Sequence, residues 1–345
     1  MIWLGFAISA VAVYFAFRNE DLGKVYIAIK QANWLILIAS MPIMVLTVVL
    51  RAWRWRYFLK ADSSTLRSRY NAVSIGFFIT NILPLRLGEF ARVLVFARSA
   101  RRSRIEVFAT IAVERFFDIL ALLILFVMIL PHIPFDAIHG GDATDSWYYR
   151  YSPRTLMAYS MGIVLCGLIG FLLLCHYGRT VWHWLVDSRD IRHPMLLRVV
   201  GSLFDGLETL WHDRKVLPAL LVSVLLWFSV AFNFWITLFA FPSGETTLGS
   251  IMGLEGSIFL DSVLCFGVAA PSAPGFFGVW QLATKAAFIP YPSADSSAVS
   301  AFAILVFLIQ YFFTLGLGLE ALKSEGMSIS DVRNVGADEA TSNGA

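Results

Sequence analysis

The chain has 345 residues, of which 58% are hydrophobic and 15% charged, and a formal net charge of +3. This is more apolar surface than one soluble core can bury, so the composition excludes a soluble globular protein. The three cysteines lack metal-type spacing, which argues against a disulfide framework or a metal site. We therefore expect an all-α polytopic membrane protein with no metal and no cofactor.

In chain order, apolar runs long enough to cross a hydrocarbon layer of about 30 Å predict six full spans. They lie at 2–17, 33–50, 105–130, 155–177, 216–241 and 298–322. The first run has no basic leader and no small-residue cleavage site, so we expect it to be retained. Amphipathic links are expected at 19–32 and 179–213, and the polar tail at 323–345 is expected to be disordered.

Basic residues gather at 51–69, 92–104 and 178–215. The positive-inside rule places these connections in the cytoplasm. It places the two chain termini and the polar tail there as well.

Two further apolar regions, 70–97 and 250–289, are too long and too interrupted for one plain helix each. Basic sequence flanks the first region on both sides, so it must enter and leave by the same face as a re-entrant helical hairpin. The flanks of the second region are neutral or acidic, which predicts a hairpin that enters from the opposite face. Proline and glycine mark the breaks, and the expected break residues are Pro84, Gly88, Pro271, Pro274, Gly275 and Gly278.

The order span, link, span, hairpin and span occurs twice along the chain, with every element reversed in direction the second time. We interpret this as one membrane domain at 1–322, built as an inverted repeat with halves at about 1–140 and 150–322. Inverted repeats with paired broken helices near the bilayer midplane are typical of transporters.

Charged side chains at membrane depth require a reason, because each costs about 2.5 to 3.5 kcal/mol there on insertion scales. After Pro84 the helix restarts with Arg86, Glu89 and Arg92 in one stripe, near the positive end of the new helix. We expect Glu89 to hold the two arginines in place. The arginines are expected to bind an anion, since the guanidinium fork fits phosphate.

Other polar residues join this candidate site. The third span carries Glu114, Arg115 and Asp118 at mid-depth, close enough in sequence to form one partly neutralised patch. The remaining candidates are Arg51, Arg54, Glu255, Asp261, Gln281 and Lys285. Plainer readings stay open: a structural ion network joining helices for the third span, interface anchors for Arg51 and Arg54, and simple helix kinks at the prolines.

Four stretches, "RAWRW", "NILPLRLGEFARVLVFAR", "VERFFDIL" and "APSAPGFFGVWQLATKAAF", occur in this order. Together they resemble the lysylphosphatidylglycerol synthase transmembrane region family, which includes the flippase domain of the multiple peptide resistance factor. The resemblance covers about 1–322. It implies a bacterial or archaeal protein of the cytoplasmic (inner) membrane that moves phosphate-bearing lipids between leaflets.

The resemblance also points to site residues by their positions in the shared stretches. They are Arg51, Arg54, Asn81, Pro84, Arg86, Gly88, Glu89, Arg92, Glu114, Arg115, Asp118, Pro271, Pro274, Gly275 and Gly278. Two departures from the family pattern matter. Only about 20 residues follow the last span, so we expect no soluble aminoacyl-lipid synthase domain and no aminoacyl transfer. Relatives tend to carry Glu where this chain has Gln281, which puts a proton-coupled role there in doubt.

The function expected from these observations is a lipid flippase or scramblase that accepts a phosphate-bearing or polyprenyl-phosphate lipid in a midplane cavity between the hairpins. Arg86 and Arg92 would hold phosphate, while Glu114 and Asp118 would balance charge or carry protons. With no nucleotide-binding motif, transport would be passive or ion-coupled. The expected partners are membrane lipids and not nucleic acid, and the sequence leaves a homo-oligomer open.

Two other functions stay open at this point. One is a membrane glycosyltransferase that uses a polyprenyl-phosphate donor, with outer-face carboxylates at Asp136, Asp142 and Asp145. The other is a secondary transporter for a small solute. Because the sequence shows no serine, histidine or cysteine nucleophile constellation, we expect the protein not to be an enzyme.

Overall fold

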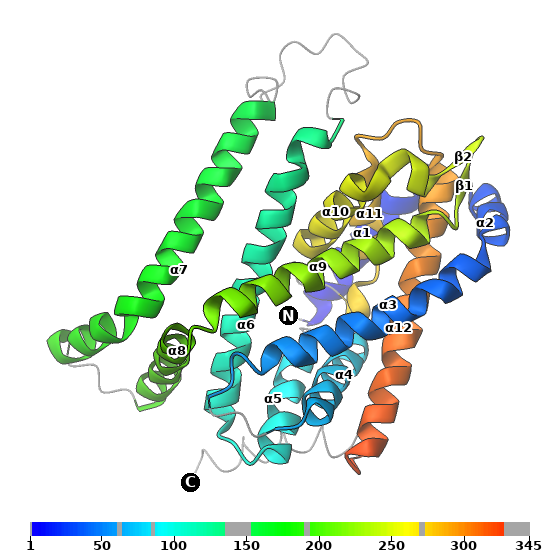
Figure 1. Cartoon of the computed structure of the whole chain (residues 1–345). Coiled ribbons are helices and arrows are strands. Elements are labelled where there is room, and N and C mark those ends of the chain that lie inside the picture. The colour runs from blue at the N-terminus through cyan, green and yellow to red at the C-terminus, as the bar shows by residue number, and fades with distance from the viewer. Residues whose placement is uncertain are drawn as a thin grey trace. The chain divides into compact units, whose positions relative to one another are not determined.

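A computed structural model of the chain describes residues 2–60, 64–83, 87–134, 153–189, 194–268 and 273–327. These residues are helical except for turns and one short hairpin, in which β1 (Pro242–Ser243) pairs antiparallel with β2 (Thr246–Thr247). The predicted all-helical class is therefore confirmed. Figure 1 shows the elements along the chain.

The α-helices and 3₁₀ turns follow the hydropathy pattern closely. They are α1 (Ile2–Phe17), α2 (Leu22–Gln31), α3 (Trp34–Trp55), α4 (Leu66–Ile82), α5 (Gly88–Ser99), α6 (Arg104–Ile129), η1 (Leu130–His132), α7 (Pro153–Arg189), α8 (Pro194–His212), α9 (Val216–Leu238), α10 (Leu248–Val268), η4 (Pro274–Phe276), α11 (Val279–Phe288) and α12 (Ser296–Ser324). The predicted amphipathic links contain α2 and α8, and the six predicted spans overlap α1, α3, α6, α7, α9 and α12.

Within the described chain, five helices are long and apolar enough to cross a membrane, and α1 adds a shorter apolar stretch, Phe6–Phe17. The five are Trp34–Trp55, Leu165–Trp184, Val216–Leu238, Leu248–Val268 and Ser296–Ser324. This confirms a multi-pass membrane protein. The set differs from the predicted six spans in three places. Helix α1, predicted as the first span, is too short to belong to it. The middle of α6 carries three charged residues, which keeps it out of the set, and α10 enters it although we predicted that region to be one arm of a hairpin.

The chain divides into two compact units, each with its own hydrophobic core. Unit 1 consists of Met1–Thr47, Ala121–Leu165 and Val224–Phe312, and unit 2 of Val48–Leu120, Cys166–Ser223 and Phe313–Ala345. Phe241, Leu260 and Phe302 are fully buried in the core of unit 1, and Trp55 and Phe96 in the core of unit 2. Each unit draws on both predicted halves of the sequence, and the inverted repeat itself stays a prediction.

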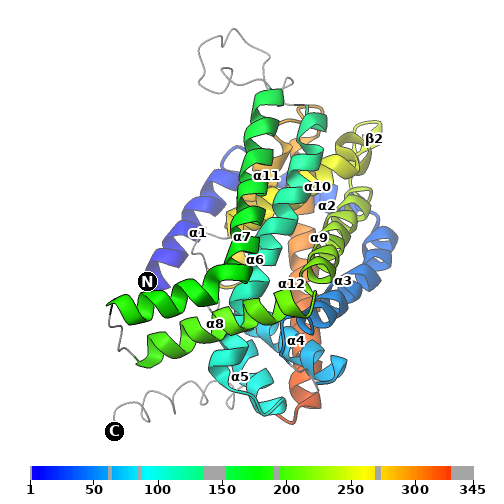
Figure 2. The ribbon, with the colours of Figure 1, turned by 60° about the vertical axis from the view of Figure 1, so that its left-hand side comes forward.

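The first irregular region is a broken helix pair in unit 2. Helices α4 and α5 pack against each other (Figure 1, Figure 2). The contact is closest at Gly88, where an added Cβ would lie 1.9 Å from the carbonyl oxygen of Gly76 and 2.1 Å from Thr80 Oγ1. Only glycine lets the two backbones approach this closely. The break residue Pro84 and the candidate Arg86 lie outside the described residues.

The second irregular region is a broken helix pair in unit 1. Helix α10 packs against α11, and α1 packs against α11 as well. Between the two arms, η4 contains Gly275 at a φ of 67°, and Pro271 lies outside the described residues. This region is therefore interrupted by a break of the kind that the sequence predicts.

Helix α1 contacts the break before α11 through backbone and side chain together. The backbone N–H of Ala273 donates a hydrogen bond to Ser9 Oγ at 2.8 Å. Gly278 has a φ of 85°, and an added Cβ there would lie 2.4 Å from the carbonyl oxygen of Ser9. Gly278 is thus required both for its backbone conformation and for the closeness of α1.

Replacing Gly88 with alanine should destabilise the protein by roughly 1 to 3 kcal/mol, because the new methyl group overlaps backbone that has no room to move. The measurement is the thermal unfolding midpoint in detergent. Gly170→Ala in α7 is the matched control, since an added Cβ there meets no atom within 4 Å. Equal midpoints for the two variants would contradict the close packing of α4 on α5.

If α4 and α5 form the predicted re-entrant hairpin, residues on either side of the pair face the same aqueous compartment. Single cysteines at Lys60 and Ala100, in a background without the native cysteines, should both react with a membrane-impermeant maleimide from the cytoplasmic side. Labelling of the two positions from opposite sides would rule out the hairpin and make α4 with α5 one crossing.

Candidate functional site

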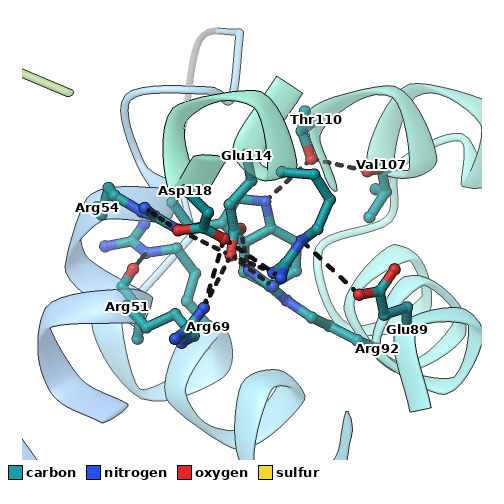
Figure 3. Close-up of polar contacts among 12 residues, drawn as sticks. Arg51, Arg54, Arg69, Glu89, Arg92, Val107, Thr110, Glu114 and Asp118 are labelled. Carbon is teal, nitrogen blue, oxygen red and sulfur yellow. Dashed lines mark hydrogen bonds and ion pairs between the residues drawn. The ribbon is translucent and has the colours of Figure 1, made fainter. Parts of the chain in front are cut away.

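Unit 2 gathers charged side chains from three helices into one cluster. The last two turns of α3 present Arg51 and Arg54 on one face, because residues three apart are neighbours on a helix. Arg92 comes from α5, and α6 supplies Glu114, Arg115 and Asp118. Figure 3 shows the two α6 carboxylates at the centre, with Arg54 on one side and Arg92 on the other.

Glu114 is the most heavily contacted member of this arginine cluster. Its side chain is fully buried, and it accepts two hydrogen bonds from Arg92, Nη1 to Oε1 at 3.0 Å and Nη2 to Oε2 at 2.7 Å. Arg54 Nη2 lies 3.0 Å from the same Oε1. The pair with Arg92 is therefore the bidentate fork that guanidinium and carboxylate groups form at their strongest.

Asp118 is bound to the same network through Arg54. Arg54 Nη1 donates to Asp118 Oδ1 at 2.6 Å and to Ser223 Oγ at 2.9 Å. Arg115 connects the two carboxylates, with Nη2 at 3.1 Å from Glu114 Oε1 and Nη1 at 3.3 Å from Asp118 Oδ2. Arg54 and Arg115 thus each hold both acidic groups.

Two arginines differ from Arg54 and Arg92, Arg51 by its longer carboxylate distances and Arg115 by its exposure. Arg51 Nη1 lies 3.8 Å from Glu114 Oε1 and 3.7 Å from Asp118 Oδ2, the longest of the distances to these two carboxylates. Arg115 keeps 38% of its side chain exposed, and its Nε lies 3.7 Å from Glu89 Oε1. Arg51 is therefore the arginine with the longest carboxylate contacts of the cluster, and Arg115 is the most exposed.

The cluster carries more positive than negative charge. Four guanidinium groups, from Arg51, Arg54, Arg92 and Arg115, face three carboxylates, from Glu89, Glu114 and Asp118. Four cations against three anions leave one positive charge, and Glu89 is the most exposed of the three acids. Such an excess in a partly dry site favours a further anion, and arginine suits phosphate in particular.

An aromatic support fixes the position of Arg92. The guanidinium carbon of Arg92 lies 3.8 Å from the ring centroid of Trp55, and the Trp55 indole donates to Thr110 Oγ1 at 3.0 Å. The same ring also contacts Phe96, with centroids 4.3 Å apart. Stacking and the bidentate pair together leave Arg92 one orientation. Thr110 and Ser223 were not expected from the sequence to belong to the site.

The structure changes the pairing that the sequence suggested around the first break. We expected Glu89 to lie between Arg86 and Arg92, but Arg92 pairs with Glu114 and Glu89 contacts Arg115. Arg86 lies outside the described residues. Asn81, the remaining candidate near this break, donates to Thr314 Oγ1 at 2.6 Å.

The candidates from the second broken pair have separate local contacts in unit 1. Asp261 is buried and accepts from Cys265 Sγ at 3.8 Å, while Glu255 is exposed. Gln281 is buried, and its Oε1 accepts the N–H of Gly278 at 2.7 Å, which satisfies a free backbone group at the start of α11. That capping contact gives Gln281 a structural role that its position in the motif did not reveal.

Lys285 is engaged at the end of α11. Its Nζ lies 2.5 Å from Glu20 Oε1 in the turn between α1 and α2, and Ser296 Oγ donates to the same oxygen at 2.6 Å. Glu20 was not a candidate from sequence. The two residues are too far apart in the sequence for their pairing to be predicted from spacing.

The cluster in unit 2 is consequently the best supported site. Within the described chain, no group of three or more His, Cys, Asp or Glu side chains could hold a metal ion. The charges of the cluster suit it to accept a further anion in place of some carboxylate contacts. Its carboxylates neutralise the arginines in the resting arrangement, and a phosphate can replace part of that neutralisation.

A known protein family matches most of the chain. The family model described as lysylphosphatidylglycerol synthase TM region matches residues 2–318. The chain matches no curated protein and no solved structure.

Glu114→Gln should lower the free energy of unfolding by about 3 to 5 kcal/mol, because it removes one partner of a buried ion network and leaves the guanidinium groups undercompensated. Chemical denaturation in detergent measures this change. Glu106→Gln on the same helix is the control: its i,i+4 pair with Arg102 is partly exposed, at 2.6 Å, and should change stability by about 0.5 kcal/mol or less. A Glu114→Gln variant as stable as the control would show that the network contributes little.

Proposed function

Because this chain belongs to the lysylphosphatidylglycerol synthase TM region family, a membrane domain associated with lipid-related, flippase-like function, we propose that it moves a lipid with a phosphate-bearing headgroup between the two leaflets. The proposal rests on one observation above the others. Four arginines surround two buried carboxylates in a multi-pass membrane protein, and the excess charge is positive.

In this proposal the headgroup phosphate binds by exchange of partners. A bare guanidinium group inside a membrane is expensive, so the carboxylates of Glu114 and Asp118 compensate the arginines while no lipid is bound. An arriving phosphate takes over some of these contacts. The charge is therefore never left unpaired, and the acyl or prenyl chains remain in the bilayer.

The arginines divide into two roles. Arg92 and Arg54 are fixed by short contacts to Glu114 and Asp118, and Arg92 also by Trp55; we assign them to the framework. Arg51 and Arg115 have longer contacts or greater exposure, and we assign them to the phosphate. Arg86, at the predicted start of the second arm of the hairpin, remains a predicted phosphate ligand.

The test is lipid crossing in vesicles that contain the purified protein. The fraction of headgroup-labelled phosphatidylglycerol that a membrane-impermeant reagent can reach should rise faster than in empty vesicles. The double variant Arg51→Gln/Arg115→Gln should slow crossing by roughly tenfold or more, because each charge-assisted hydrogen bond lost contributes about 1.5 to 3 kcal/mol.

The matched control is Arg98→Gln, a change of the same type at an exposed position in the last turn of α5. It should leave crossing at the wild-type rate, and circular dichroism should show all variants equally helical. Unchanged crossing in the double variant would remove these arginines from the mechanism. Sugar transfer from a polyprenyl-phosphate donor without lipid crossing would favour a glycosyltransferase instead.

A further inference from the structure

A second basic site in unit 2 lies outside the arginine cluster. It is a pocket of about 360 Å³ that forms where the end of α3, the start of α4 and the start of α9 meet. Its lining residues are Arg56, Tyr57, Ser64, Arg69 and Lys215. Three of these five side chains are cations, and the other two carry hydroxyl groups that can donate to an anion.

Arg69 forms the rigid wall of this pocket. Its side chain is buried, with Nε donating to the carbonyl oxygen of Ala52 at 3.0 Å. Its Nη1 donates to the carbonyl oxygen and the Oγ of Ser64, at 3.1 and 2.9 Å. Ser64 lies two residues before α4 begins, so the pocket also borders the positive end of that helix dipole.

The other two cations, Arg56 and Lys215, are accessible to an anionic ligand. Arg56 is exposed, and its guanidinium carbon lies 5.2 Å from the ring centroid of Tyr57. Among the described residues, no carboxylate lies within ion-pair distance of Arg56. Lys215 Nζ lies 2.8 Å from Asp213 Oδ2, and both side chains are partly exposed. Exposed pairs of this kind are weak, so an incoming anion can compete with Asp213.

An apolar surface adjoins the basic pocket. A neighbouring pocket of about 480 Å³ is lined by Trp211, His212, Arg214, Val216 and Leu217, in the turn that also carries Lys215. Leu217 is 63% exposed and Trp211 is 38% exposed. Cationic groups beside exposed apolar side chains match a ligand that carries a phosphate at one end and a hydrocarbon chain at the other.

We propose that the pocket of Arg56, Arg69 and Lys215 binds the phosphate of an anionic phospholipid as a stationary site, separate from the arginine cluster. Arg69 presents a fixed guanidinium group, Arg56 and Lys215 close on the phosphate from the surface, and the hydrocarbon lies along Trp211 and Leu217. The site anchors unit 2 to anionic lipid and does not depend on the transport proposed for the cluster.

The test is native mass spectrometry of the full chain in detergent, with phosphatidylglycerol added in steps. The double variant Arg56→Gln/Lys215→Gln should bind one lipid fewer, or bind it about tenfold more weakly. Arg98→Gln/Lys24→Gln removes the same charge at exposed positions outside the pocket and should bind lipid as the wild type does. Arg69 is left unchanged, because its hydrogen bonds hold the local backbone.

A second arm separates lipid from soluble phosphate. Equilibrium dialysis with radiolabelled inorganic phosphate should show no difference between the double variant and the control. A difference with inorganic phosphate but none with phosphatidylglycerol would overturn the lipid assignment in favour of a soluble anion. Equal binding of both probes to both variants, or a lower unfolding midpoint with unchanged binding, would overturn the site itself.

The Arg51→Gln/Arg115→Gln variant provides the remaining control. It should retain the stationary lipid even though its transport is impaired. Failure of the transport proposal and failure of this one are therefore distinguishable, since one is measured as crossing and the other as retention.

Discussion

The bidentate pair between Arg92 and Glu114 is the interaction on which the arrangement of unit 2 depends. Both side chains are buried, and two short hydrogen bonds join them. A buried ion pair of this kind is rarely a large net gain in stability, but the loss of either partner leaves a charge that the surroundings cannot solvate. The rest of the cluster follows from that requirement: Arg54 bridges Glu114 to Asp118, Arg115 faces both, and Trp55 covers the flat face of Arg92.

The pair is placed by the packing of α4 against α5. Arg92 is one turn into α5, and it lies beside Gly76 of α4 while its guanidinium group contacts Glu114 of α6. The packing of α4 against α5 needs Gly88 against Gly76, because any side chain at Gly88 would overlap backbone. Gly88 and the helix break thus both contribute to placing the guanidinium group of Arg92 beside the buried carboxylate of Glu114. This geometry accounts for the composition of the segment, in which charged residues follow directly after apolar ones.

Much of this could be predicted from the sequence, and the misses have a common physical cause. Hydropathy located the helices, since each must present apolar side chains along its length, and charges at membrane depth identified Arg92, Glu114 and Asp118. The sequence could not predict which charged residues pair with one another. Local spacing suggested Glu89 as the partner of Arg92, whereas tertiary packing supplies Glu114. Lys285 likewise pairs with Glu20, which is 265 residues away in the sequence. Gln281 was a transport candidate from its motif, and its capping contact with Gly278 was not foreseen. Spacing along a helix says which residues share a face; it does not say which face of another helix arrives there.

The contact of Ser9 with Ala273 and Gly278 sets an order on how the protein is made. Ser9 leaves the ribosome 264 residues before Ala273, so the first helix enters the bilayer long before the turn that it holds has been synthesised. Until then the Ser9 hydroxyl lacks its partner Ala273 and can only bond a carbonyl of its own helix, water or lipid. The contacts between α1 and the second broken pair can therefore form only after Gly278 has been synthesised, so α1 reaches its final environment long after it has been made.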